Sequence, residues 1–350
     1  MRKNKVKVVI WGFGAMGSGM ARMILNKQGF DIVGICDMYD KIVGKSMYEV
    51  LNIDVQNHDV IISNNIETLI ENTKPEIVLL ATDSYTKIAF PKIKFLVEHG
   101  CNVISTAEEM AYPYAKEPIL SKELNELAKR NNVTILGTGV NPGMMMDLLA
   151  ITLTGIMRDV KDFNITRVNS LSPFGKTVME EQGVGFSVSE FNEKREKGLI
   201  AGHVGFIEST HMIANALGLE VTDFHQSMDP IITDVDRKSP YGYSKKGDVC
   251  GVDMRSYSKL SNYNSINMRH PQQIEPELGG VKTRDSIEIT GQPFVNMTIS
   301  PEIDGGIGTI AICVNMIPHV INANSGLKTM IDLPVPRAIM GDVRLFLDEE

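Results

Sequence analysis

The stretch Val8-Val9-Ile10-Trp11-Gly12-Phe13-Gly14-Ala15-Met16-Gly17 decides the fold. It runs from an apolar, strand-like segment through glycines spaced as G-x-G-x-x-G into a helix-forming segment. Gly12 permits the tight turn, Gly14 has no Cβ and so lets backbone approach a pyrophosphate, and Gly17 lets helix and strand pack closely. The N–H groups and the dipole at the helix start favour phosphate. We therefore predict that residues 12–17 bind a dinucleotide; the alternative is a glycine-rich turn that binds nothing.

Further cofactor contacts are expected where the neighbouring strands end. A strand at residues 30–36 ends at Asp37, twenty residues after Gly17, where an acid can accept both hydrogen bonds of an adenosine ribose diol. Thr82 ends one later strand and Asn141 follows another, and ligands of parallel sheets bind at the carboxyl ends of strands. Asp37 would repel a 2′-phosphate, which favours NAD, whereas Lys41 and Lys45 leave NADP open.

The order of elements predicts an α/β fold. Strands are expected at 6–10, 30–36, 60–63, 77–82, 101–105 and 133–136, and helices at 16–26, 41–51, 66–72, 89–99 and 121–130, the last capped by Ser121. This alternation predicts a doubly wound parallel sheet, a Rossmann domain, at residues 1–147. Residues 148–307 read as an α+β substrate and dimerisation domain with a mixed or antiparallel sheet, in which 236–262 is rich in glycine and polar turns. Residues 308–350 are expected to return to the first domain.

Composition excludes several classes of function. The chain has 350 residues and a net charge of -8, and it contains no basic run, which argues against a nucleic-acid partner. Its four cysteines are scattered, and no paired Cys/His set is present, so we expect buried reduced thiols and no metal. No signal peptide and no apolar run long enough to span a bilayer stands out, which predicts a cytoplasmic protein without a membrane partner.

Two adjacent acids are the first candidates for chemistry. The strand at 103–105 delivers Thr106-Ala107-Glu108-Glu109 to the rim of the sheet, on the side where a nicotinamide would lie. A carboxylate that is partly buried there would have a raised pKa and could act as a base near neutral pH. Glu108 and Glu109 point to different sides, so one of them is expected to face the site. The alternative is a pair of acids that complements a helix N-terminus.

Polar residues of the second domain form the other candidate set. Arg167 and Asn169 alternate with Val168, so they share one strand face, and an arginine there suits a carboxylate; the alternative is a surface arginine. His203 lies in a glycine-flanked approach to a helix. His270 lies in His270-Pro271-Gln272-Gln273, a polar cluster able to hold a ligand. No nucleophile set of the Ser/His/Asp or Cys/His kind is apparent, which disfavours hydrolases.

Over nearly its whole length the chain resembles the NAD(P)-dependent 2,4-diaminopentanoate dehydrogenases and the related native amine dehydrogenases, whose Rossmann domain is similar to that of dihydrodipicolinate reductase. The resemblance is carried by Trp11-Gly12-Phe13-Gly14-Ala15-Met16-Gly17, Asn102-Val103-Ile104-Ser105-Thr106-Ala107-Glu108-Glu109, Gly139-Val140-Asn141-Pro142-Gly143, Gly202-His203-Val204-Gly205, His270-Pro271-Gln272-Gln273-Ile274 and Asp332-Leu333-Pro334. The first block is common to many dehydrogenases. The combination of the second with His-Pro-Gln-Gln is much more specific.

The resemblance implies reversible oxidative deamination of (2R,4S)-2,4-diaminopentanoate to 2-amino-4-oxopentanoate and ammonia, a step of ornithine degradation, in a homodimer. It places the catalytic glutamate on Glu108, where the similar homoserine dehydrogenases (V-T-A-N-K) carry lysine, and substrate contacts on Arg167, Asn169, His203 and His270. The alternatives are an oxidoreductase like homoserine dehydrogenase or dihydrodipicolinate reductase, or a dinucleotide sensor without catalysis. The absence of lysine at position 108 argues against an alcohol-oxidising enzyme, and the polar groups gathered at one rim argue against a sensor.

Overall fold

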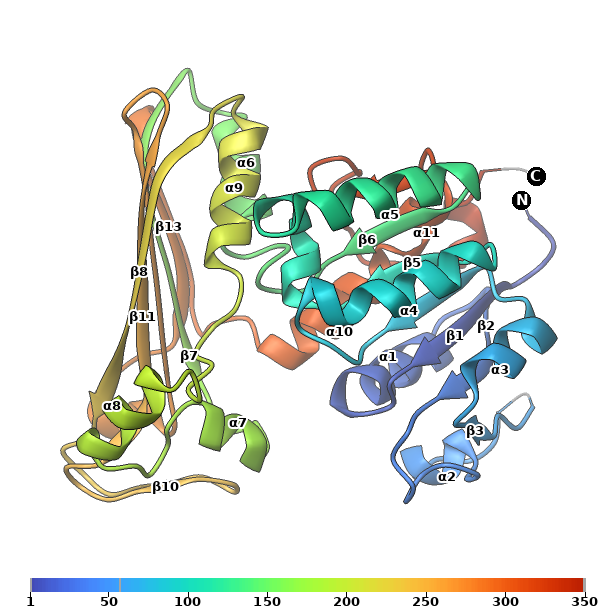
Figure 1. Cartoon of the computed structure of the whole chain (residues 1–350), viewed down its shortest axis with the longest axis horizontal. Coiled ribbons are helices and arrows are strands. Elements are labelled where there is room, and N and C mark those ends of the chain that lie inside the picture. The colour runs from blue at the N-terminus through green and yellow to red at the C-terminus, as the bar shows by residue number, and fades with distance from the viewer. Residues whose placement is uncertain (1, 57, 349–350) are drawn as a thin grey trace. The chain divides into compact units, whose positions relative to one another are not determined.

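The chain forms two compact units, Met1–Met144 with Gly305–Glu350 and Met145–Asp304, which we call unit 1 and unit 2 (Figure 1). The structure is a computed structural model that describes residues 2–56 and 58–348. The domain limits expected from the sequence, at 147/148 and 307/308, refer to parts that fold independently. A division into compact units does not test independent folding, so these limits stay predictions.

Unit 1 is built on a parallel sheet of seven strands in the order β15-β6-β5-β4-β1-β2-β3. The strands are β1 (Val6–Trp11), β2 (Phe30–Cys36), β3 (Ile62–Ser63), β4 (Ile77–Leu80), β5 (Asn102–Ser105), β6 (Thr134–Gly137) and β15 (Gly326–Lys328). All of their pairings are parallel. Val8, Val9 and Ile10 are fully buried, as expected for a central strand covered on both faces. The predicted Rossmann sheet is confirmed.

Helices cover both faces of this sheet (Figure 1). They are α1 (Ala15–Leu25), α2 (Met47–Leu51), α3 (Ile66–Thr73), α4 (Thr86–Glu98), α5 (Pro118–Arg130), α10 (Gly305–Asn315) and α11 (Ile317–Ile321), with short 3-10 turns η1 (Glu108–Ala111), η2 (Pro113–Ala115) and η4 (Val343–Phe346). α10 packs on α1, where a Cβ on Gly19 would lie 2.2 Å from Cδ1 of Ile310. The C-terminal segment therefore returns to the first sheet through the close packing of α10 on α1.

Three helix predictions were wrong in their limits. The stretch expected to be helical from 41 is helical only from Met47, because Ser46 caps α2 and Gly44 turns the chain with φ +81°. α4 begins at Thr86, before the expected start at residue 89. α5 begins at Pro118, so Ser121 is not its cap but a buried residue whose hydroxyl donates to the carbonyl of Glu117 at 2.7 Å.

Unit 2 is built on a mixed sheet of six strands in the order β14-β13-β7-β12-β11-β8. The strands are β7 (Asp159–Ser170), β8 (Val221–Ile232), β11 (Val249–Leu260), β12 (Ser265–Gln273), β13 (Arg284–Gln292) and β14 (Val295–Ile299), with a separate hairpin of β9 (Arg237–Lys238) and β10 (Tyr243–Ser244). The pairing of β7 with β12 is parallel, and the others are antiparallel. The expected mixed sheet is confirmed, but β11 and β12 were not predicted from the sequence.

One face of the unit 2 sheet carries its core, together with α6 (Leu148–Thr154), α8 (Val188–Glu196) and α9 (Phe206–Ala216); α7 (Lys176–Glu181) and η3 (Pro276–Gly279) lie outside that core. On β7, Phe163 and Ile165 belong to this face and are buried. Because side chains alternate along a strand, Arg167 and Asn169 continue the same face. The inner face thus changes from apolar to polar toward the end of β7.

All four cysteines are buried and free. Burial raises the pKa of the Cys313 thiol to about 12, so that this group stays protonated near neutral pH. No group of three or more potential metal ligands occurs in residues 2–56 and 58–348. The helices within these ranges include none with the length and hydropathy needed to cross a bilayer.

Candidate active site

The glycine turn after β1 fits a dinucleotide pyrophosphate. A Cβ on Gly12 would lie 2.5 Å from the carbonyl oxygen of Ala81, and one on Gly17 would lie 1.8 Å from that of Gly12. Gly12 also has φ +95°, which L side chains rarely adopt. A Cβ on Gly14 would meet no atom within 4 Å and would instead point into open space at the start of α1. The first and third glycines are therefore required by packing, and the second leaves room for a ligand.

Asp37 is held beside this turn by backbone groups. Its Oδ2 accepts from the Phe13 N–H at 2.5 Å, and its Oδ1 accepts from the Tyr39 N–H at 2.8 Å. A carboxylate fixed in this way can also accept from the hydroxyls of a ribose. Asp37, Gly12 and Gly14 line one hollow of about 390 Å³. The hollow therefore has the residues that an adenosine ribose and a pyrophosphate require.

The segment after β4 also lines this hollow. Thr82 and Lys92 line it, and the Lys92 ammonium donates to Thr82 Oγ1 at 3.0 Å and to both Asp83 oxygens at 2.9 Å. The same ammonium lies 5.9 Å from the centre of the Trp11 ring. Sequence reasoning named Thr82 and missed Lys92 because a lysine in a helix usually belongs to the solvated face.

The two adjacent acids have different environments. Glu109 is buried, with Oε2 accepting from the Thr86 N–H at 2.9 Å and Oε1 from the Lys116 ammonium at 3.0 Å. It therefore caps the N-terminus of α4, which has no side-chain cap at Tyr85. Glu108 is the first residue of η1 and is only half-buried. This arrangement commits Glu109 to the fold and favours Glu108 as the acid that meets a ligand.

Asn141 lies in the loop that follows β6. The loop is anchored by the Val140 N–H, which donates to Thr309 Oγ1 at 3.1 Å, and it turns at Gly143 with φ +126°. Thr309 belongs to α10, so the returning C-terminal segment holds a loop at the carboxyl edge of the sheet. Asn141 is thereby placed at the same edge as the glycine turn, where parallel sheets bind their ligands.

Unit 2 brings the other predicted polar residues together. β7 and β12 are parallel neighbours, and Nε2 of His270 lies 3.0 Å from Oδ1 of Asn169. The rings of His203 and His270 meet edge to face with their centres 4.6 Å apart. His203 comes from the segment before α9, between Gly202 with φ +61° and Gly205 with φ +139°. The cluster on which the sequence prediction depended therefore exists in space.

Arg167 is buried in this cluster and paired with an acid that the sequence did not single out. Its Nη1 donates to Asp285 Oδ1 at 2.5 Å and its Nη2 to the carbonyl of Ile303 at 2.5 Å. The other Asp285 oxygen accepts from the Ile303 N–H at 2.8 Å. Asp285 and Arg167 are register partners on β13 and β7, a signal that becomes readable only once the strand pairing is known. The guanidinium charge is therefore neutralised inside unit 2.

Both imidazoles of the cluster are uncharged. Burial, with a smaller contribution from the Arg167 charge, lowers the pKa of His203 to about 3. Burial first, then His203 and Arg167, hold the pKa of His270 well below its usual value. An uncharged imidazole carries one N–H donor and one bare nitrogen that can accept a hydrogen bond. Unit 2 presents a site that forms hydrogen bonds and carries little net charge.

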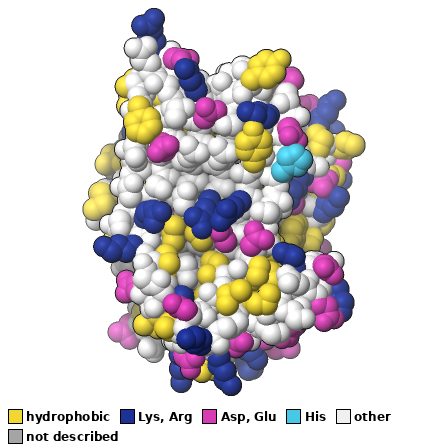
Figure 2. All heavy atoms as spheres, turned by 90° about the vertical axis from the view of Figure 1, so that its left-hand side faces the viewer, with side chains coloured by type: hydrophobic (Ala, Val, Ile, Leu, Met, Phe, Trp, Pro, Cys, Tyr) yellow, Lys and Arg dark blue, Asp and Glu magenta, His cyan; other side chains and the backbone are white. Residues whose placement is uncertain are grey.

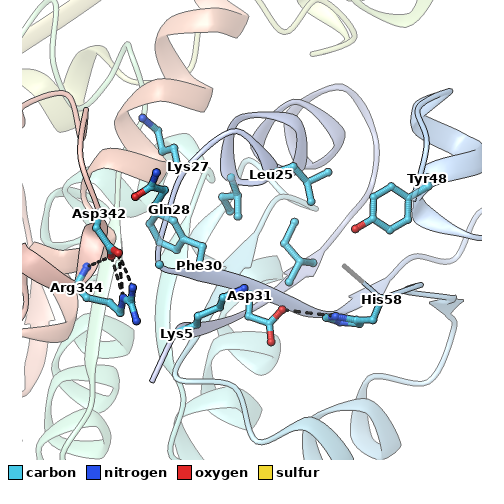
Figure 3. Close-up of a pocket in the computed structure, with 13 residues that line it drawn as sticks. Lys5, Leu25, Lys27, Gln28, Phe30, Asp31, Tyr48, His58, Asp342 and Arg344 are labelled. Carbon is cyan, nitrogen blue, oxygen red and sulfur yellow. Dashed lines mark hydrogen bonds and ion pairs between the residues drawn. The ribbon is translucent and has the colours of Figure 1, made fainter. Parts of the chain in front are cut away.

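Another hollow of unit 1, of about 340 Å³, lies at the opposite edge of its sheet (Figure 3). It is lined by the end of α1 and the start of β2, away from the carboxyl ends of the strands. Four of its side chains form two pairs: Arg344 with Asp342 at 2.6 Å and His58 with Asp31 at 3.8 Å (Figure 3). Of the two hollows, the one at the glycine turn lies at the carboxyl edge, where parallel sheets bind their ligands.

Comparisons with known proteins agree with this geometry. The family model of the 2,4-diaminopentanoate dehydrogenase C-terminal domain matches residues 144–349, and that of the dihydrodipicolinate reductase N-terminus matches residues 6–109. A 2,4-diaminopentanoate dehydrogenase from Acetoanaerobium sticklandii is 55% identical over 99% of this chain and 98% of its own length.

Solved structures give the same picture. An amine dehydrogenase from Mycobacterium smegmatis matches with a TM-score of 0.85 and 27% identity over 96% of this chain and 98% of its own. An apo scyllo-inositol dehydrogenase from Lactobacillus casei matches with a TM-score of 0.55 and 10% identity over 95% and 93%, which extends the likeness of the fold alone. The Rossmann half is thus a nicotinamide-dinucleotide fold. The chain belongs to the 2,4-diaminopentanoate dehydrogenase family and is an oxidoreductase of the amine dehydrogenase class.

Proposed function

We propose that the protein oxidises the C4 amine of (2R,4S)-2,4-diaminopentanoate, releasing 2-amino-4-oxopentanoate and ammonia, and that it also runs in reverse as a reductive amination. Membership of the family supports the substrate, since the relative from Acetoanaerobium sticklandii carries that name. The observation that supports the mechanism is the different environment of each of two adjacent acids. Glu109 is buried and caps α4, whereas Glu108 is half-buried at the edge where the cofactor fold binds its ligand.

Glu108 is the proposed base. A protonated amine has no lone pair with which to expel a hydride, so the C4 ammonium must first lose a proton, and a carboxylate at position 108 takes it. When bound, the nicotinamide supplies a hydride acceptor. Glu108 then releases the first proton to solvent, accepts a proton from the water that adds to the oxidised carbon, and returns that proton to the departing nitrogen. Arg167, Asn169, His203 and His270 hold the rest of the substrate, Arg167 by hydrogen bonds because Asp285 already balances its charge.

We propose NAD as the preferred cofactor, with Gly12, Phe13, Gly14, Ala15, Met16, Gly17, Asp37, Thr82 and Asn141 as its contacts. Asp37 is fixed by two backbone N–H groups and so cannot easily turn away from a 2′-phosphate. Of the lysines that could favour NADP, Lys45 lies 3.2 Å from Glu49 and is thereby balanced, whereas Lys41 stands over the Tyr39 ring. Comparing kcat/KM with NAD and NADP tests this preference, and a higher value with NADP would overturn it.

The decisive experiment replaces each acid in turn. Glu108→Gln is expected to abolish NAD-dependent oxidation of 2,4-diaminopentanoate while leaving NADH affinity, measured by fluorescence, close to that of the wild type. Glu109→Gln is the matched control, and it should retain turnover because a glutamine oxygen can still accept from the Thr86 N–H. Loss of turnover in the Glu109 variant alone would reverse the assignment. In the reductive direction, consumption of NADH must require ammonia.

We also propose a homodimer formed through the outer face of the unit 2 sheet, the face away from α8 and α9. Figure 2 views this side, where a group of basic side chains lies beside acidic ones. Asp253 binds Arg255 at 2.7 Å and Arg269 at 2.9 Å there, so one carboxylate serves two cations. A second copy turned by 180° would place the same face, with its basic and acidic side chains, against this one. Light scattering should give twice the monomer mass, and a monomer would contradict the proposal.

A further inference from the structure

Two buried polar atoms of β12 have no hydrogen-bond partner in residues 2–56 and 58–348. They are Nδ1 of His270 and Nε2 of Gln272. His270 is 4% exposed and Gln272 7%, so bulk water does not reach either atom freely. A buried donor or acceptor that stays unpaired is costly, and such atoms in a native fold call for an explanation. A ligand that supplies the missing partners is one.

The two residues share a strand face with the cluster already described. Along β12, His270 and Gln272 are two positions apart and so point to the same side of the sheet. Gln272 is also the register partner of Asn169 on β7, which binds His270. Gln273 points to the other side, where its Oε1 accepts from the buried Arg237 at 2.6 Å. One glutamine of the pair is therefore structural, and its neighbour is not.

The chemistry of each unpaired atom follows from its partners. Asn169 Oδ1 is an acceptor, so Nε2 of the neutral His270 ring carries the proton and Nδ1 is a bare acceptor. Gln272 Nε2 is a donor. The face therefore presents one acceptor and one donor on adjacent positions of the same strand side. A ligand that matches it has its own donor beside its own acceptor.

We propose that Gln272 and His270 read the α-amino-acid head group of the substrate. Gln272 Nε2 donates to the carboxylate, and His270 Nδ1 accepts from the 2-ammonium group. This inference rests on the proposed function, because the substrate named there carries both groups next to its C2 carbon. Gln272 thus binds the carboxylate, a role that Arg167 cannot take by forming an ion pair, because Asp285 already neutralises its guanidinium.

The test combines two variants with substrates that lack one half of the head group. The substrates are 2,4-diaminopentanoate, 4-aminopentanoate, which lacks the 2-amino group, and pentane-2,4-diamine, which lacks the carboxylate. The variants are Gln272→Leu and His270→Gln, the second of which can keep a donor toward Asn169 while losing the Nδ1 acceptor. Gln226→Leu, at an exposed position of β8, is the matched control. KM is measured where an analogue turns over, and Ki against 2,4-diaminopentanoate where it does not.

Loss of a hydrogen bond to a charged ligand group weakens binding by about ten- to hundredfold. Gln272→Leu should therefore raise KM in this range for 2,4-diaminopentanoate and 4-aminopentanoate, and the penalty should vanish for pentane-2,4-diamine. His270→Gln should penalise the two compounds that carry the second amine, and the penalty should vanish for 4-aminopentanoate. Without substrate, Gln272→Leu should melt no lower than the wild type, because it gives up no protein partner.

Two results would overturn the inference. One is a KM for 2,4-diaminopentanoate in Gln272→Leu within about twofold of wild type, which would mean that water or nothing pairs with this amide. The other is an equal penalty on all three compounds, or a lowered melting temperature, which would make the residue structural. Failure of the proposed function looks different, because the wild type would then turn over none of these amines or Glu108→Gln would remain active.

Discussion

Removing the carboxylate of Asp285 is expected to destabilise unit 2 strongly. Arg167 is 2% exposed and Asp285 is 4% exposed, so Asp285→Ala leaves a buried guanidinium without its counter-ion. Breaking a buried pair in this way costs about 3–5 kcal/mol. The Ile303 N–H, which donates to the second Asp285 oxygen, also loses its partner, at about 1 kcal/mol. The expected total is about 4–6 kcal/mol.

The double variant Arg167→Met/Asp285→Leu should be more stable than Asp285→Ala. It removes both charges, and the remaining cost is the two backbone groups of Ile303, about 2–3 kcal/mol together. We would measure urea unfolding by far-UV circular dichroism, because the single tryptophan, Trp11, lies in unit 1 and reports on that unit. Glu288→Ala, on the opposite face of the same strand, is the control and should cost under about 1 kcal/mol. A double variant less stable than the single one would refute the reasoning.

Three further predictions concern the glycine turn, the capping acid and the histidine His203. Gly14→Ala should weaken dinucleotide binding by about tenfold or more and leave the melting temperature unchanged. Gly17→Ala should lower the unfolding free energy by about 1–3 kcal/mol, because its Cβ would lie 1.8 Å from a backbone oxygen. Calorimetry measures both effects, and equal effects of the two variants would contradict the roles assigned. Glu109→Ala should destabilise by about 1–3 kcal/mol in chemical unfolding, and Glu109→Gln by less, since only the glutamine can accept from the Thr86 N–H. The pKa of His203 is lowered to about 3 in the folded protein, below its value in the unfolded chain. The stability that burial of the neutral ring provides is therefore present above about pH 6.5 and is lost as pH falls toward 3, at up to about 1.4 kcal/mol per pH unit. His203→Gln should flatten this pH dependence of the unfolding free energy, and an unchanged slope would disprove it.

The Rossmann half could be predicted because its signals are local. The glycine spacing, the apolar runs and Asp37 each lie within a few residues of the feature that they specify. Helix limits were harder, since the start of α4 is fixed by a carboxylate, that of Glu109, which lies 23 positions from the N–H that it caps. No window of sequence around Thr86 contains that partner.

Unit 2 could be predicted only in part. β11 and β12 were missed because their outward positions are polar and their glycines and prolines resemble turn signals. They are strands because they pair with neighbouring strands, which no local pattern shows. Arg167, Asn169, His203 and His270 were singled out from local sequence, and the family resemblance gave them a role as substrate contacts. Asp285 was not singled out, because its meaning depends on strand register. The difference between Gln272 and Gln273 follows from the alternation of a strand that the sequence did not reveal.

The cluster on β7 and β12 has a consequence for the conditions under which the enzyme works. Alkaline solution favours the loss of a proton from an amine, and it would weaken any recognition site built from groups that titrate above neutrality. Amides do not titrate, and the imidazoles of His203 and His270 have already lost their protons well below pH 7. The protein groups that recognise the substrate should therefore keep their protonation state while the medium becomes basic enough to drive the oxidation forward.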